Sequence, residues 1–211
     1  MQITTGIRSI LALPFVYRLA MRILGNTANR RWFINDILAL RGGEKVVDVG
    51  CGPADILSDL PATVAYVGLD VSEPYIEAAR ERYGERATFI AGDVDDWAAD
   101  ERVRNADLVF MNGVLHHVDD AEAKRLLVFV HKILGPNGRF IFCEPCYLLW
   151  QSRVSAFMMS LDRGQNIRTE QEWKNLVGYL FSKFETNIVT SVNRLGYIWI
   201  VGQCSKVLPL V

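Results

Sequence analysis

The chain has no excess of charge of either sign. Its 23 Lys and Arg residues nearly balance 24 Asp and Glu residues, which leaves a formal net charge of −1. Because the two signs alternate along the chain, there is no broad basic surface for a phosphate backbone. We therefore do not expect nucleic acid as a partner.

Cysteine is also scarce. Four cysteines in a chain of 211 residues do not form a disulfide framework, so we expect a reducing compartment, the cytoplasm. Cys143 and Cys146 have the CxxC spacing of a metal or redox motif, but no second pair and no histidine pair at ligand spacing accompanies them. We therefore predict no metal site.

A long uninterrupted hydrophobic run is missing too. The most apolar stretch, residues 3–25, is broken by three arginines and by Pro14. It is too short for a membrane span of about 20 residues and lacks the cleavage site of a signal peptide. We expect residues 1–40 to form N-terminal helices that cap the site. Contact with a membrane surface through this segment is the less favoured alternative, because its amphipathicity is weak.

What the chain does have is enough apolar material for one large core, since 50% of its residues are hydrophobic. Strand-like and helix-like segments alternate, which predicts a doubly wound α/β fold with a mostly parallel sheet. The expected strands are residues 45–49, 64–69, 87–91, 106–111 and 139–143, and the expected helices are residues 29–43, 54–60, 74–83 and 121–134.

The end of the chain departs from this alternation. The runs "FETNIVTSV" and "YIWIVGQC" are strand-like and are separated by "NRLG". A short turn between two such runs predicts a hairpin at the sheet edge. With it the sheet becomes a seven-stranded, Rossmann-like sheet whose C-terminal hairpin strand is antiparallel.

The stretch "KVVDVGCGPADIL" places two glycines, Gly50 and Gly52, where the first strand meets the next helix. Glycines allow a ligand to approach the main chain, and ligands of open parallel sheets bind at this edge. Asp70 ends the second strand twenty residues after Gly50, where an acid binds a ribose diol. The pattern indicates a ribose-bearing cofactor.

A dinucleotide is disfavoured among such cofactors. The fingerprint G-x-G-x-x-G/A requires a small residue where this chain has Asp55, and a carboxylate there repels a diphosphate. A cofactor without phosphates is favoured. An NAD-dependent oxidoreductase is therefore a distant third function, after the two given below.

Five segments, "VVDVGCGPADIL", "YVGLDVS", "FIAGDVDDW", "ADLVFMNGVLHHVDD" and "ILGPNGRFIFCEP", resemble the class I S-adenosylmethionine-dependent methyltransferases of the small-molecule type in order and spacing. The resemblance covers roughly residues 40–145 and departs from the family at Ala54, where many members have a third glycine. It implies S-adenosylmethionine as cofactor, S-adenosylhomocysteine as product and a small-molecule acceptor. The alternative is an S-adenosylmethionine-binding protein of the same fold, without methyl transfer or with another cofactor-dependent reaction.

The resemblance also implies roles for single residues at the cofactor. The backbone at Gly50, Cys51 and Gly52 lines the methionine part, with Asp48 near its ammonium group. Asp70 binds the ribose, although capping of the next helix is the alternative for it. The rest of the predicted set is Val71 beside Asp70, Asp93 with Val94 at the adenine, and Asn112 on the sulfonium side. For Asp93 a merely solvated acid is the alternative.

Methyl transfer depends mainly on positioning, and a base is needed only for a weak nucleophile such as a hydroxyl. His116 and His117 follow the fourth strand and are the candidate catalytic bases, with His117 preferred. The alternative is that they shape the loop. A metal site built with Asp119 and Asp120 is disfavoured because the loop lacks the i, i+4 histidine spacing of helical sites. We expect O- or C-methylation rather than N-methylation.

The chain is predicted to be a single domain, with the cofactor half in residues 41–145 and the acceptor side in residues 146–211. The long connection after the fifth strand is rich in apolar residues and carries Arg153, Arg163 and Arg168. It suits an apolar acceptor with an acidic group, and core packing is the alternative. The predicted acceptor contacts are Tyr17, Arg18, Glu144 and Arg163.

Overall fold

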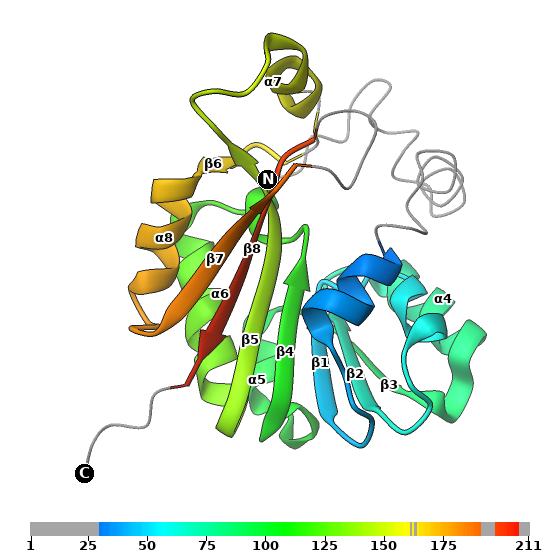
Figure 1. Cartoon of the computed structure of the whole chain (residues 1–211). Helices are drawn as coiled ribbons and strands as arrows, with labels where there is room; N and C mark the ends of the chain where they lie inside the picture. The colour runs from blue at the N-terminus through cyan, green and yellow to red at the C-terminus, as the bar shows by residue number, and fades with distance from the viewer. Residues whose placement is uncertain (1–29, 161, 163, 191–196, 207–211) are drawn as a thin grey trace.

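The computed structural model describes residues 30–160, 162, 164–190 and 197–206 of the chain. In this part an eight-stranded sheet has seven strands in the order β3-β2-β1-β4-β5-β8-β7 (Figure 1). Strands β1 to β5 are parallel, and β8 is antiparallel to both β5 and β7. The bounds are β1 Lys45–Val49, β2 Ala65–Asp70, β3 Thr88–Ala91, β4 Ala106–Asn112, β5 Leu134–Tyr147, β6 Arg168–Thr169, β7 Phe184–Val189 and β8 Trp199–Ser205.

Both faces of the sheet are buried, as the alternation along β1 shows. Val47 and Val49 belong to one apolar cluster and Val46 to the other. The first cluster takes side chains from α5 (Val94–Ala99), α6 (Asp120–Ile133) and α8 (Glu170–Gly178). The second takes them from η1 (Phe33–Leu38), η2 (Asp55–Asp59) and α4 (Glu73–Tyr83). The predicted doubly wound α/β fold is confirmed.

Several details differ from the sequence expectations. The predicted helix over residues 54–60 is a short 3₁₀ helix, Asp55–Asp59, because Ala54 is left-handed and Pro61 follows soon after. The first helix is α-helical at residues 30–32, continues as the π-helix η1 and ends at left-handed Ala39, before the two glycines expected to stop it. The fifth strand begins at Leu134, directly after α6, and is much longer than predicted.

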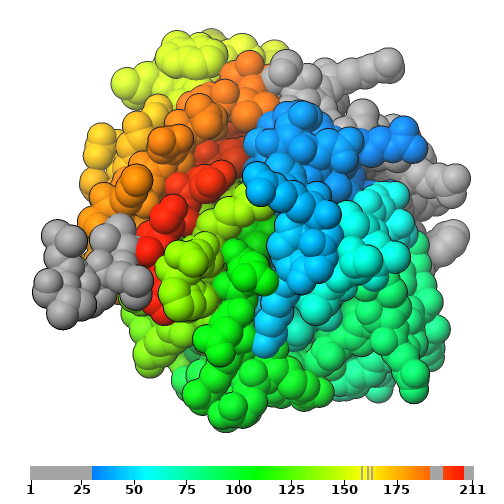
Figure 2. All heavy atoms as spheres, turned by 60° about the horizontal axis from the view of Figure 1, so that its bottom comes forward, coloured from blue at the N-terminus to red at the C-terminus, as the bar shows by residue number. Residues whose placement is uncertain are grey.

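The remaining short elements are η3 (Gly84–Arg86), η4 (Glu101–Val103), η5 (Leu115–His117) and α7 (Arg153–Ser160). Helix α7 stands beyond the carboxyl ends of the parallel strands (Figure 1). Figure 2 turns the opposite end toward the viewer, where the blue residues around β1 lie between green and cyan ones, in agreement with the strand order. No helix in the described ranges is both long enough and apolar enough to cross a membrane.

Candidate active site

The glycine turn after β1 is built against the end of β2. The amides of Gly50 and Cys51 both donate to the Leu69 carbonyl, at 2.7 and 3.0 Å. Gly50 has a φ of 79°, and a Cβ there would lie 2.5 Å from Val114 Cγ2. A side chain at Gly50 is therefore excluded both by the backbone conformation and by the loop after β4.

Ala54 has a φ of 53°, the left-handed conformation that glycine adopts without strain. This explains the departure noted in the sequence: the third position of the turn keeps the conformation that a glycine would take and accepts strain of about 1–2 kcal/mol.

Asp70 stands at the end of β2 and closes the turn. Its Oδ2 accepts from the Gly52 amide and its Oδ1 from the Ser72 amide, each at 2.8 Å. Burial raises the pKa of Asp70, although these two hydrogen bonds oppose the shift. Ser72 makes no side-chain cap to α4. The carboxylate thus fixes the backbone on both sides of the expected ribose position.

Asp48 lies inside β1 and is only 4% exposed. Its Oδ2 accepts a hydrogen bond of 2.5 Å from the Tyr66 hydroxyl on β2. Burial raises the pKa of Asp48 to about 7, the Tyr66 hydrogen bond opposes this, and the charge of Asp70 adds to it. Asp48 is therefore a buried acid that titrates near neutrality and gains from a cationic ligand.

The other predicted cofactor residues also lie at the carboxyl ends of strands. Asp93 follows β3 and is the N-cap of α5, where its Oδ1 accepts from the Asp95 and Asp96 amides. Val94 is buried beneath it, Val71 is exposed after β2, and Asn112 is exposed at the end of β4.

The loop after β4 is organised by Glu144, which is fully buried in β5. Its Oε1 accepts from the amides of Val114 and Leu115 at 2.9 and 2.8 Å. Its Oε2 lies 2.7 Å from Nδ1 of His116. Glu144 was predicted as an acceptor contact; in the structure it positions the loop that carries the two histidines.

His116 lies between two carboxylates. Its Nε2 lies 3.3 Å from Oδ1 of Asp162, in the segment after α7. Burial by itself lowers the pKa of His116, but the hydrogen bonds to Asp162 and Glu144 outweigh it and raise the pKa to about 9. The half-buried ring of His117 packs on His116, with ring centroids 4.0 Å apart.

Residues of the segment "DRGQNIRT" contact the loop after β4 and fix its conformation. A Cβ on Gly164 would overlap the His116 ring, and the Asn166 amide donates to the His116 carbonyl at 3.0 Å. Arg168 is buried, and its guanidinium donates to the Leu115 and Val118 carbonyls and to Asp120. The sequence predicts that Arg168 is one of the cations near an acidic acceptor, whereas in the structure its contacts fix the loop after β4.

Of the other predicted acceptor residues, Tyr17, Arg18 and Arg163 lie outside the described residues. Arg153 begins α7 and is exposed, as are Trp150 and Phe157. Met159 is fully buried, so part of the apolar connection is core.

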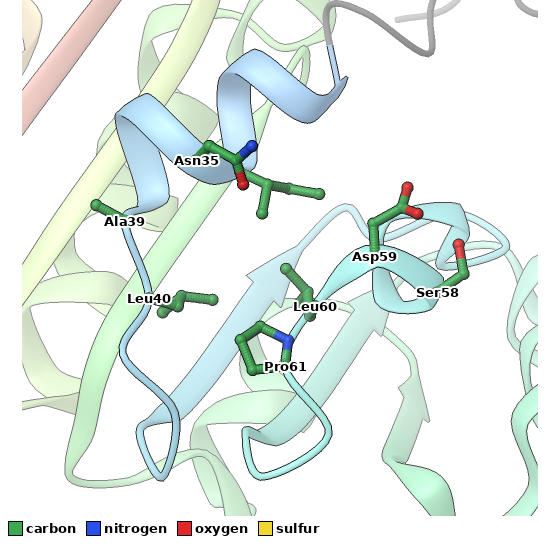
Figure 3. A pocket seen from close by; sticks show the side chains of 8 residues that line it. Asn35, Ala39, Leu40, Ser58, Asp59, Leu60 and Pro61 are labelled. Carbon is green, nitrogen blue, oxygen red and sulfur yellow. The ribbon is translucent and has the colours of Figure 1, made fainter.

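A groove of about 370 Å³ lies between η1 and η2 (Figure 3). Its lining includes Asn35, Leu40, Ser58 and Asp59, and Asp59 pairs with Arg30 at 2.6 Å. None of the glycine-turn residues lines it. This groove is therefore not the cofactor site.

Comparison with known proteins agrees with this geometry. Residues 46–138 match the family model described as a methyltransferase domain. An uncharacterized methyltransferase of Synechocystis, sll0829, is 31% identical over 155 residues, which cover 69% of this chain and 71% of that protein. The O-methyltransferase aunE of Aspergillus niger is 26% identical over 137 residues, or 64% of this chain and 39% of aunE.

Two solved structures share the fold. The pyocyanin biosynthetic protein PhzM has a TM-score of 0.69 at 23% identity, with 96% of this chain and 62% of PhzM covered. A SAM-dependent methyltransferase from Archaeoglobus fulgidus has a TM-score of 0.71 at 15% identity, with 90% and 99% covered. The chain spans 35–39% of the first three curated relatives, all fungal O-methyltransferases.

The sheet order and the glycine turn define a cofactor-binding α/β domain of the methyltransferase type. The chain belongs to the class I S-adenosylmethionine-dependent methyltransferases. The cofactor of this family is S-adenosylmethionine, as the sequence resemblance implied.

Replacement of Gly50 by alanine tests the turn. Gly50→Ala adds left-handed strain and a clash with Val114, so we expect a loss of about 2–4 kcal/mol in unfolding free energy and at least tenfold weaker binding of S-adenosylhomocysteine. Gly43→Ala is the matched control, because Gly43 has a φ of 85° with open space around it. Thermal unfolding and calorimetry measure both effects; equal losses in the two variants would contradict this account.

The pKa of Asp48 predicts a pH dependence of cofactor binding. Below pH 7 free Asp48 holds a proton that an ammonium group must displace, so affinity for S-adenosylhomocysteine should rise up to tenfold per pH unit toward pH 7 and then level off. Tyr66→Phe removes the hydrogen bond that lowers this pKa and should move the midpoint to higher pH. Calorimetry between pH 5.5 and 8.5 measures it, and a flat profile in the unmodified protein would disprove the role of Asp48.

Proposed function

We propose that the protein transfers the methyl group of S-adenosylmethionine to a small-molecule acceptor, with oxygen or carbon as the reacting atom in preference to nitrogen. The observation that carries this proposal is the turn at Gly50 to Gly52, which is closed by Asp70 and backed by buried Asp48. The similarity to proteins named O-methyltransferases supports the oxygen.

In this proposal the cofactor lies along the carboxyl ends of β1 to β4. The ribose binds Asp70 and Val71, the ammonium group lies near Asp48, and the adenine lies between Asp93 and Val94. The reactive methyl group then points past Asn112 toward the loop with the two histidines. The protein mainly holds the acceptor atom in line with the sulfur–methyl bond, which is how binding accelerates a displacement.

A hydroxyl acceptor also needs a base, and His117 is the better candidate of the two histidines. Both ring nitrogens of His116 face carboxylates, so His116 is engaged in holding the loop. His117 is half-buried beside it. The proton of the acceptor hydroxyl moves to His117 while the oxygen–methyl bond forms and the sulfur–methyl bond breaks.

The acceptor is proposed to be apolar with an acidic group. The exposed Trp150 and Phe157 near α7 supply apolar surface, and Arg153 and Arg163 supply the cations. Tyr17 and Arg18 close over the acceptor in this proposal. Since all four cysteines are free thiols, we also propose the reducing cytoplasm as the compartment.

Titration with S-adenosylhomocysteine, with NAD as the comparison, tests the cofactor. We expect micromolar binding of the first and none of the second. Asp70→Ala should weaken binding about 10- to 150-fold, because a charge-assisted hydrogen bond contributes about 1.5–3 kcal/mol. Asp55→Ala, in the same motif but paired with Arg82 on the surface, should bind normally.

Two results would contradict the proposal: binding of NAD alone, or equal affinity in the Asp70→Ala variant with its fold intact by circular dichroism. Binding without acceptor-dependent formation of S-adenosylhomocysteine across a broad panel of hydroxyl and carbon acceptors would favour the alternative of a binding protein.

A further inference from the structure

Three potential metal ligands converge beside the cofactor edge. His116 and His117 belong to η5, and Asp162 follows α7. One ligand atom from each lies within 4.8 Å of the others. The two histidines were visible in the sequence, but the carboxylate that joins them was not, since it comes from a segment far along the chain.

The outer contacts of this cluster orient the ligands as they do in metal sites. Glu144 holds Nδ1 of His116 at 2.7 Å, which turns Nε2 toward Asp162. The N–H of the second ring nitrogen of a metal-binding histidine characteristically donates a hydrogen bond to a carboxylate in this way. Asp162 is itself held by the Gly164 amide at 2.7 Å and by the Tyr197 hydroxyl.

One pair of ligand atoms is also spaced as it would be around an ion. The 3.3 Å between His116 Nε2 and Asp162 Oδ1 exceeds the length of about 2.7–2.9 Å usual for a charge-assisted hydrogen bond. Two atoms each about 2.0–2.1 Å from a tetrahedral zinc ion lie about 3.3–3.4 Å apart. By contrast, the Glu144 contact on the other nitrogen has the short hydrogen-bond length.

The charge of the cluster favours a cation. Glu144 is fully buried, and the Asp162 side chain is 24% exposed. Within the described residues, the ion pairs of both carboxylates are with His116. Two carboxylates that share one imidazole leave negative charge in a low-dielectric place, which a divalent ion compensates.

We propose that His116, His117 and Asp162 bind a divalent first-row transition metal ion, with zinc as the best match, and that the ion has an open position on the acceptor side. Two imidazoles and one carboxylate are a nitrogen and oxygen donor set that suits zinc. Three protein ligands with a free fourth position are the arrangement of reactive zinc sites rather than structural ones.

The consequence for the reaction rests on the function proposed above, whereas ion binding does not. An ion at this place lowers the pKa of an acceptor hydroxyl bound to it, so the hydroxyl proton passes to solvent. The acceptor oxygen then forms the bond to the methyl group while the sulfur–methyl bond breaks, and sulfur keeps the electron pair as a neutral thioether. The ion replaces the proton transfer to His117.

The experiment is calorimetric titration of untagged, chelator-treated protein with zinc chloride. We expect one equivalent to bind with micromolar or tighter affinity. Asp162→Asn and His117→Gln should each weaken binding at least 100-fold. His131→Gln is the matched control, since His131 lies in α6 outside the cluster. Zinc that is bound by the cysteine thiols would bind equally to all variants, which distinguishes it from zinc bound by the cluster.

Titration of the same proteins with S-adenosylhomocysteine separates this inference from the proposed function. Asp162→Asn should bind S-adenosylhomocysteine like the unmodified protein, which also shows that the variant folds. Absent zinc binding, or binding that both cluster variants retain, would overturn the metal site and leave His117 as the base. If the unmodified protein does not bind S-adenosylhomocysteine, the proposed methyltransferase function is refuted instead.

Discussion

The hydrogen bonds of the Glu144 carboxylate hold the loop after β4, which carries His116 and His117, in its conformation. A buried carboxylate is costly unless its oxygens are satisfied, and Glu144 is satisfied by the amides of the loop after β4 and by the His116 ring. These hydrogen bonds offset the burial of the carboxylate only when the loop after β4 has the conformation seen in the structure. Removal of the carboxylate leaves several buried donors without an acceptor, each at about 1–3 kcal/mol.

The same loop ties the acceptor side to the cofactor side. Val114, whose amide is held by Glu144, packs its side chain over Gly50, where a Cβ would clash. The turn expected to hold the methionine part of the cofactor is therefore shaped by the loop expected to hold the acceptor. A change in the position of the histidine loop must also change the space around the glycine turn, so the two halves of the site are mechanically linked.

Much of the cofactor side could be predicted from sequence, because its determinants are local. Buried strands, a glycine turn and an acid at the next strand end all fall within about thirty residues, Lys45 to Asp70. The helix cap at Asp93 was not predicted: the sequence indicates adenine binding for Asp93, with a solvated acid as the alternative, and the structure shows that its carboxylate also caps the short helix α5. The roles of the cofactor residues remain predictions, although the structure brings them to one edge.

The acceptor side could not be predicted in this way, because its contacts join segments that are far apart in the chain. Glu144 and Arg168 have residue types that suggest ligand binding, yet they satisfy backbone groups of the loop after β4. Asp162 was not predicted as a site residue, because nothing in the adjacent sequence indicates that it will lie opposite His116. The glycine at position 164 follows from the same constraint, because any side chain there would displace the His116 ring.

The distribution of charge bears on how one site can accept the cofactor and release the product. Asp48 and Asp70 are close enough for the charge of Asp70 to raise the pKa of Asp48, so the site is strained by like charges before a ligand arrives. S-adenosylmethionine brings two positive centres, the ammonium and the sulfonium, whereas S-adenosylhomocysteine retains the ammonium alone. An acidic site therefore favours the reactant over the product by the attraction of its carboxylates for the sulfonium. In the proposed binding mode this part of the attraction is lost once the methyl group has moved, which favours release of the product.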